Sequence, residues 1–537
     1  LVTMAWWDDL WLNEGFAEWM QSKATDQFHP EWKLWFDAMD QKQAAMGVDS
    51  RQGTHPIIQS IKDVFQANEA FDAITYLKGQ AVIWMLEDFV GADNFRSGVQ
   101  AYIKAHAYAP AVTDDLWRAL SKTSPAPIAN VAHDFTLQPG APLIRVEKTK
   151  SGIRLTEGQF VADDSAEPAA RWRVPVIARA VVGEKEWRGV VVPNKPTDIP
   201  LDAGATAIVN AGQAGYYRTL YAPDLFEALS SKFAALASID QLGLIDDARS
   251  LGLAGYAPLS NFLALTSRAT PDMAPQVLAG VADALAGMAR SYQGLPGEPA
   301  FDSFGRAVLD PILARVGWEA AANEDSNVTL LRGDLLDTLS ALNDQSVIDE
   351  ADRRFAAYLT DPSALSSDLR SMVLGIVAEH ATPKNWDALH ALARKADTSL
   401  ERNRLYRLLG ETRDEALAKR ALAITLTDEA PVTTRPSIID AVSEFHPELA
   451  FDFAVAHLDQ VNAWLEPDSR TEFEAGLAGN ANDPAMIDKL KAFAEAHIPP
   501  TGRQAAVRAE GEIAYAAKIR AERLPEVDQW LAAHPAP

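Results

Sequence analysis

The first twenty residues, LVTMAWWDDLWLNEGFAEWM (1–20), decide how the rest of the sequence is interpreted. Leu12, Phe16 and Trp19 recur at i, i+4 and i+7, a spacing that predicts a helix with one apolar face. One carboxylate of this run, Glu14, lies in its middle among four tryptophans and a phenylalanine. A carboxylate buried among apolar side chains is costly unless it is paired or bound to a metal ion. Glu14 is therefore the first candidate for a functional residue.

The composition limits which partners and metal sites are expected. The formal net charge of −25 argues against nucleic acid and anionic membranes as partners, because both select basic surfaces. The chain has no cysteine, so a disulfide framework and a cysteine-based zinc site are excluded. Any metal ion must be held by His, Asp and Glu. The absence of cysteine is compatible with the cytoplasm and with the periplasm, so the sequence leaves the compartment and the oligomeric state open.

Three segments of different character follow one another in the 537 residues, and 48% of the residues are hydrophobic, as in soluble globular proteins. Residues 1–137 have helical periodicity, for example in the apolar run 81–89 before Gly91. Residues 138–222 hold short β-branched runs between Gly, Pro and Asn breaks, which predicts a β-sandwich. Residues 223–537 predict one helix after another, typical of an α-solenoid of the HEAT type. The expected fold class is multidomain α+β, mostly α. The predicted strands are 143–146, 153–156, 173–182, 187–192 and 207–209.

The spacing of the histidines does not predict two metal ligands on one helix. No two of them lie three to five residues apart, so an H-E-x-x-H helix is not encoded in these residues. Each isolated His is expected on the surface or in a satisfied core position. The ten histidines are at positions 29, 55, 106, 133, 380, 390, 446, 457, 497 and 534.

Two segments remain as candidate sites. In the first, Glu14 and Glu18 share a helix face and Gln21 lies two turns beyond Glu14, although a solvated face would show the same pattern. In the second, residues 71–79 (FDAITYLKG), Tyr76 stands at the start of an apolar helix. A tyrosine hydroxyl can donate a hydrogen bond to a developing oxyanion. The alternative for Tyr76 is a core tyrosine whose hydroxyl is merely satisfied.

Several motifs, read together, resemble the gluzincin zinc aminopeptidases, the family of alanyl and puromycin-sensitive aminopeptidases. The resemblance implies the end of a thermolysin-like catalytic domain (1–137), then a β-sandwich (138–222) and an α-solenoid (223–537). It also implies that the substrates are peptides with a free N-terminus. The matching segments are WWDDLWLNEGFAEW (6–19), THPI (54–57), FDAITYLKGQAVIWML (71–86), DFTLQPGAPLI (134–144) and NAGQAGYYRTLY (210–221).

The resemblance also implies roles for single residues. Glu14 matches the zinc-ligating Glu of the family's N-E-G-F-A segment, and Tyr76 matches the oxyanion-stabilising Tyr of Y-x-K-G. Phe71 is similar to an aromatic residue that lines the substrate pocket, and Gln21 stands where many relatives have a carboxylate behind a ligand His. The family spacing places the two His ligands upstream of residue 1. We therefore expect a C-terminal portion of a zinc aminopeptidase that is inactive alone.

One alternative belongs to another class of protein. The same fold could serve as a non-catalytic scaffold whose solenoid binds peptides or proteins. The presence of both Glu14 and Tyr76 favours the enzyme, because a scaffold has no chemical need for either residue.

Overall fold

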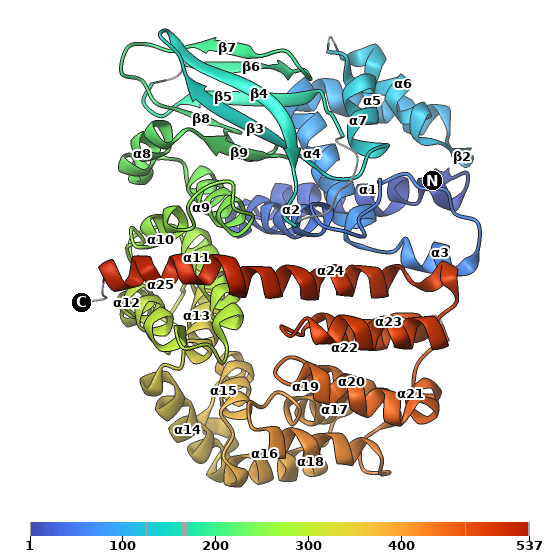
Figure 1. Cartoon of the computed structure of the whole chain (residues 1–537), viewed down its shortest axis with the longest axis vertical. Coiled ribbons are helices and arrows are strands. Elements are labelled where there is room, and N and C mark those ends of the chain that lie inside the picture. Colours follow the sequence, from blue (N-terminus) through green and yellow to red (C-terminus); the bar gives the residue numbers. More distant parts are fainter. Residues whose placement is uncertain (1, 125, 164–169, 184, 468, 535–537) are drawn as a thin grey trace. The chain divides into compact units, whose positions relative to one another are not determined.

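A computed structural model describes residues 2–124, 126–163, 170–183, 185–467 and 469–534 (Figure 1). The chain divides into two compact units, Leu1–Val277 and Leu278–Pro537. No helix in the described ranges is long and apolar enough to cross a membrane.

The first unit begins with helices, as the sequence predicts for this segment. The expected helix at 81–89 is confirmed as part of α4, which ends at Gly91 with a positive φ of 87°. Ten residues of α4 are buried, since it is apolar on nearly every side. A π-helical turn, Ile74–Lys78, runs directly into α4. The helices are α1 (Trp11–Phe28), α2 (Trp35–Asp49), α3 (Val64–Glu69), α4 (Gly79–Val90), α5 (Ala92–Ala105), α6 (Thr113–Thr123) and α7 (Ile128–Thr136), and the short strands β1 (Thr3–Met4) and β2 (Pro110–Ala111) pair in parallel.

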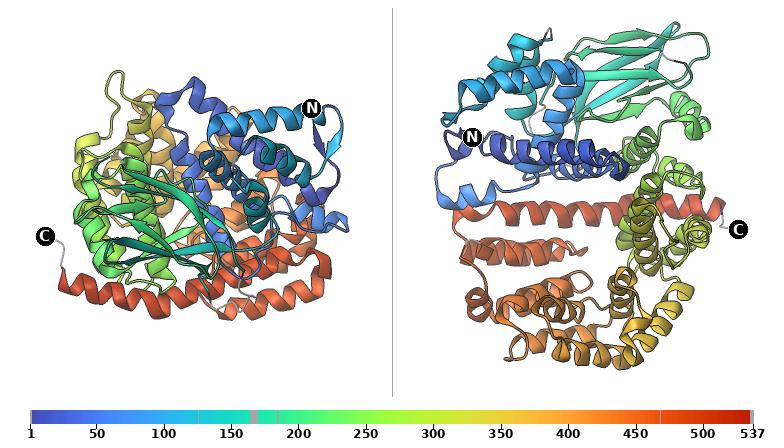
Figure 2. Two further views of the ribbon diagram at one scale, coloured as in Figure 1. Left: turned by 90° about the horizontal axis from the view of Figure 1, so that it is seen from above. Right: turned by 180° about the vertical axis from the view of Figure 1, so that it is seen from behind.

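Two sheets follow, and they confirm the predicted β-sandwich (Figure 2). One sheet has the order β7-β4-β3-β9 and the other the order β6-β5-β8. Among the described strand pairs of these two sheets, β3–β9 is parallel and the others are antiparallel. The strands β7 and β9 were not predicted, because β7 (TDIP) contains Asp and Pro, which are uncommon in strands, and β9 (RTLY) does not alternate clearly. The strands are β3 (Ala141–Lys148), β4 (Gly152–Phe160), β5 (Val174–Ala180), β6 (Glu186–Val191), β7 (Thr197–Pro200), β8 (Ala207–Val209) and β9 (Arg218–Tyr221).

Three helices complete the first unit after the sheets: α8 (Pro223–Ser231), α9 (Ser238–Leu253) and α10 (Ser260–Thr266). The change from strands to helices falls at Tyr221, close to the predicted end of the sandwich. The domain boundaries at 137 and 222 themselves stay predictions.

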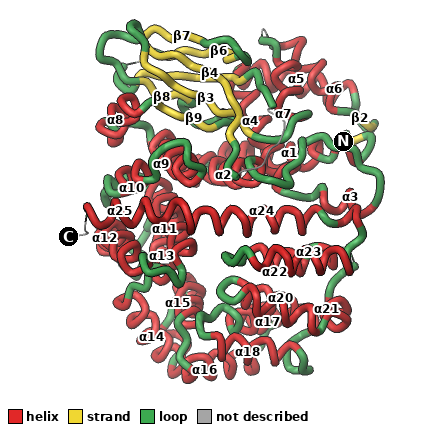
Figure 3. Tube along the Cα trace, in the orientation of Figure 1, coloured by secondary structure: helices red, strands yellow, loops and turns green. Residues whose placement is uncertain are grey.

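The second unit is helical throughout its described residues (Figure 3). Helices that follow one another in sequence pack together, for example α14 with α15 and α16 with α17. This arrangement is the α-solenoid that the sequence predicts. Its helices are α11 (Pro275–Tyr292), α12 (Glu298–Val316), α13 (Ser326–Ala341), α14 (Gln345–Thr360), α15 (Ser367–Glu379), α16 (Pro383–Lys395), α17 (Ser399–Leu408), α18 (Glu415–Thr425), α19 (Arg435–Ser443), α20 (Pro447–Ala456), α21 (Leu458–Trp464), α22 (Phe473–Gly479), α23 (Ala485–His497), α24 (Gln504–Lys518) and α25 (Leu524–Ala533).

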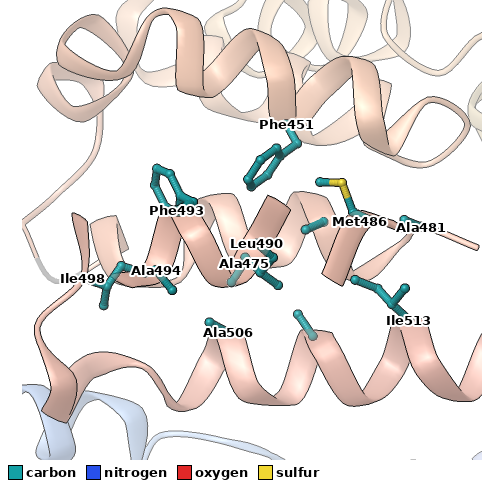
Figure 4. Packing of buried hydrophobic residues seen from close by; sticks show 12 residues of the cluster. Phe451, Ala475, Ala481, Met486, Leu490, Phe493, Ala494, Ile498, Ala506 and Ile513 are labelled. Carbon is teal, nitrogen blue, oxygen red and sulfur yellow. The ribbon is translucent and has the colours of Figure 1, made fainter. Parts of the chain in front are cut away.

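The last helices of this unit are tied to its core and to its first helices. Phe451, Leu490, Phe493 and Ile513 belong to one buried cluster that joins α20, α23 and α24 (Figure 4). At the far end, the Tyr292 hydroxyl donates to Asp528 Oδ1 on α25 at 2.9 Å. The C-terminal helix is therefore an integral part of the solenoid.

Candidate active site

The structure brings together the two residues that the sequence singles out, Glu14 and Tyr76. Glu14 lies in the first turn of α1 and is half-buried, and Tyr76 lies in the π-helical turn before α4. The π-helical turn of Tyr76 packs against α1, so that the Glu14 carboxylate lies near the Tyr76 hydroxyl. Sixty-two positions separate the two residues in sequence (76 − 14), so the contact arises from the packing of α1 against the π-helical turn.

Two glycines allow this close packing. Gly15 follows Glu14, and Gly79 is the first residue of α4. A Cβ atom on Gly79 would lie 3.2 Å from the Cα of Gly15, which is tighter than ordinary van der Waals contact. Any larger residue at either position would push the two backbones apart. The glycine of N-E-G-F-A and the glycine of Y-x-K-G therefore set the distance between Glu14 and Tyr76.

The turn that carries Tyr76 is unusual. A π-helix is rare and often marks a functional site, because its wider turn changes the direction in which side chains point. Here it places Tyr76 toward α1, while its neighbours Thr75 and Lys78 are buried on other sides.

Lys78, the lysine of Y-x-K-G, holds the other end of this turn. Its ammonium group lies 2.8 Å from the carboxylate of Asp49, and both side chains are 0% exposed. Asp49 also accepts hydrogen bonds from the Gly140 N–H at 2.7 Å and the Tyr216 hydroxyl at 3.0 Å. The pair thus links the turn of Tyr76 to the start of the β-sandwich. This pair was not predicted from sequence, although both Lys78 and Tyr216 lie within the matching motifs.

Two aromatic side chains, Phe71 and Trp7, lie beside Tyr76. The ring centroids of Phe71 and Tyr76 are 6.4 Å apart, and those of Trp7 and Phe71 are 6.0 Å apart. Phe71 is 47% exposed and Trp7 is 37% exposed, so both rings offer apolar surface to a ligand near Glu14. The position of Phe71 agrees with its predicted pocket-lining role, which stays a prediction. Trp7 was not assigned a role from sequence.

Gln21 lies two turns of α1 beyond Glu14. It is exposed on α1, seven residues and therefore about 10 Å along the helix axis beyond Glu14. Its proposed role behind a ligand His stays a prediction. Glu18, one turn beyond Glu14, adds negative charge near the Tyr76 hydroxyl.

The electrostatic surroundings keep Tyr76 protonated. Burial, together with the carboxylates of Glu14 and Glu18, raises the pKa of Tyr76 to about 12. The hydroxyl therefore remains a hydrogen-bond donor over the whole physiological pH range, as an oxyanion-stabilising group must.

Glu14 fits one place in a zinc site by its chemistry, since a carboxylate oxygen is a common zinc ligand beside two histidines. Among the residues that the structure describes, no group of three His, Cys, Asp or Glu side chains could hold a metal ion. The role of Glu14 as a zinc ligand stays a prediction.

Comparisons with known proteins place the chain in a family. The model of the peptidase family M1 domain matches residues 1–135, and the model of the ERAP1-like C-terminal domain matches residues 207–512, more than half of the chain. The chain belongs to the M1 family of peptidases. The first of these matches contains Glu14 and Tyr76, and the second contains the solenoid of this M1 chain almost completely.

Similar curated proteins agree with this family. The M1 chain is 28% identical to aminopeptidase M1-A of Oryza sativa subsp. japonica over 97% of its own length. It is 30% identical to aminopeptidase M1 of Arabidopsis thaliana and 31% identical to aminopeptidase M1-C of Oryza sativa subsp. japonica, each over 80% of its length. The chain spans 62% of the first of these proteins and 51% of each of the other two.

Proposed function

We propose that this chain is part of a zinc-dependent aminopeptidase that removes N-terminal residues from peptides. The observation that carries the proposal is the proximity of the Tyr76 hydroxyl to the Glu14 carboxylate, which brings the expected oxyanion donor to the expected metal ligand. Membership of the M1 family and the aminopeptidase names of the relatives support the same reaction class. The substrates would be peptides with a free α-amino group.

Glu14 would be one of three protein ligands of zinc, with two histidines from residues outside this sequence. When bound, zinc supplies a Lewis acid for the scissile carbonyl and lowers the pKa of a bound water. The Tyr76 hydroxyl lies near the Glu14 carboxylate, so it can reach an oxygen held near the metal position. It would donate its hydrogen bond to the oxyanion of the tetrahedral intermediate. Phe71 and Trp7 would cover the site on one side and exclude water.

We further propose that the 537-residue chain alone binds zinc weakly and has no peptidase activity. The support is that the described residues supply one ligand of the expected three. Metal analysis of the purified chain, combined with an aminoacyl-arylamide hydrolysis assay, tests this. We expect less than stoichiometric zinc and no turnover. Stoichiometric zinc with turnover would contradict the proposal.

The matched experiment extends the chain through the coding sequence upstream of Leu1. We expect an H-E-x-x-H segment whose second His lies six residues before Leu1, and zinc-dependent hydrolysis of aminoacyl arylamides. An upstream sequence without this segment would favour the scaffold instead.

A further inference from the structure

The backbone turn that carries Tyr76 is held at its start by one residue, Asp72. Its Oδ1 accepts hydrogen bonds from the N–H groups of Ile74 at 3.0 Å and Thr75 at 3.2 Å. Its main-chain oxygen accepts from the N–H of Tyr76 at 3.1 Å. The first N–H groups of a helix have no partner within the helix, so such an acceptor fixes where the helix begins. Asp72 thus determines the register of the turn and with it the direction of Tyr76.

Asp72 is in turn held by His55. The Asp72 Oδ2 atom lies 2.8 Å from His55 Nε2, and His55 Nδ1 lies 2.8 Å from the carbonyl oxygen of Pro56. Since the Pro56 carbonyl oxygen can only accept, Nδ1 donates to it, and the hydrogen bond between Nε2 and Asp72 Oδ2 then fixes the ring and the carboxyl group relative to each other. The side chains of His55 and Asp72 are 11% and 13% exposed. A largely buried hydrogen bond of this length is directional, and it orients the carboxyl group of Asp72.

We propose that His55 and Asp72 form a positioning pair that places the Tyr76 hydroxyl beside Glu14. The inference rests on the proposed function, in which Tyr76 stabilises the oxyanion. In addition, His55 of the THPI segment influences the chemical step indirectly, because it holds Asp72, and Asp72 holds the π-helical turn that carries Tyr76. A displacement of a reacting group by about 1 Å can lower a rate by about a hundredfold, so loss of the pair should be visible in kcat.

If the pair were purely structural, its loss would lower the stability of the protein, and the effect on kcat would not depend on whether Tyr76 is present. A double-mutant cycle separates the two roles, because residues that act through one another give non-additive effects. The cycle uses the full-length enzyme with His55→Phe, Tyr76→Phe and the double variant. His55→Gln is the conservative variant, since its amide N–H can still donate to Asp72.

We expect His55→Phe to lower kcat about tenfold or more, with KM changed less than about twofold. Tyr76→Phe should lower kcat about a hundredfold or more, and adding His55→Phe should lower it no further. His55→Gln should recover most of the rate. His133→Phe is the control, because His133 on α7 forms a more exposed pair with Asp114 on α6, at 2.7 Å, and neither residue belongs to the turn of Tyr76. This control should leave kcat unchanged.

A spectroscopic measurement on the 537-residue chain is independent of activity. With ¹⁵N-labelled histidine, the ring of His55 should show the strongly downfield-shifted proton of a hydrogen bond between an imidazole nitrogen and a carboxyl group. This signal should disappear in His55→Gln, a variant that needs little repacking. Absence of the signal from the wild type would overturn the inference.

The kinetic outcomes also separate the two proposals. An unchanged kcat in Tyr76→Phe would overturn the proposed role of Tyr76 and the inference with it. A low kcat in Tyr76→Phe, combined with additive losses in the double variant or a normal kcat in His55→Phe, would overturn only the positioning pair.

Discussion

A Cβ atom placed on Gly15 would lie 3.0 Å from both the Cα and the carbonyl carbon of Gly79. The two glycines therefore fix the closest approach of α1 to the start of α4, and this approach brings Glu14 to Tyr76. Backbone atoms cannot move aside as a flexible side chain can, so a methyl group at this point must displace one helix.

The first prediction concerns Gly15→Ala. Overpacking costs about 1–3 kcal/mol, whereas alanine gains up to about 1 kcal/mol over glycine within a helix. We expect a net loss of about 1–2 kcal/mol in the free energy of unfolding of the first unit, measured by urea denaturation. Gly47→Ala in α2 is the control, because its nearest neighbour is the end of the Arg51 side chain at 3.4 Å. Equal stability of both variants would show that the glycine contact is not tight.

The second prediction concerns the buried pair of Lys78 and Asp49. Removal of one partner leaves an uncompensated buried charge, which costs about 3–5 kcal/mol. Lys78→Met should lower the free energy of unfolding by this amount, in the same transition that Gly15→Ala lowers. Lys148→Met is the control: Lys148 and Asp224 are 3.4 Å apart and are 67% and 54% exposed. An exposed pair contributes at most about 1 kcal/mol. Similar losses in both variants would contradict the structural role of Lys78.

The third prediction concerns pH and Glu474 in the solenoid. Glu474 is 1% exposed, and neither carboxylate oxygen has a hydrogen-bond partner among the described residues. Burial raises the pKa of Glu474 from 4.5 to about 7. The folded state therefore binds a proton that the unfolded state has lost between these pH values. The resulting stability is present in full below about pH 4.5 and is lost as the pH rises through about 7, in total on the order of 3 kcal/mol.

Glu474→Gln should remove this pH dependence. The variant should be more stable than the wild type at pH 8 and similar to it at pH 4, as measured by urea denaturation of the second unit. Glu448→Gln on α20 is the control, since the Glu448 side chain is 52% exposed. The same pH profile in wild type and Glu474→Gln would show that Glu474 does not titrate as its burial indicates.

Sequence reasoning found the parts of the site that lie in local motifs. Glu14 and Tyr76 stand in segments whose residue types and spacing are specific, and the helix before Gly91 follows from its apolar periodicity. The sandwich was predicted from β-branched runs, but β7 (TDIP) and β9 (RTLY) were missed, because their residue types give little strand signal without the strands that they pair with.

The supporting contacts could not be predicted from sequence. The pairs Lys78–Asp49 and His55–Asp72 join segments whose contact depends on tertiary packing. The motif THPI contains His55, but nothing in its residue types identifies Asp72 as the partner. The π-helical turn was also not predicted, because a helical pattern does not distinguish a π-turn from an α-turn.

The central claim is that Glu14 holds zinc and Tyr76 acts on the substrate. Zinc affinity and kcat of full-length Glu14→Ala and Tyr76→Phe test it most directly. We predict that Glu14→Ala loses stoichiometric zinc and turnover, whereas Tyr76→Phe keeps zinc and lowers kcat about a hundredfold or more with little change in KM. Stoichiometric zinc and normal turnover in Glu14→Ala would contradict the account.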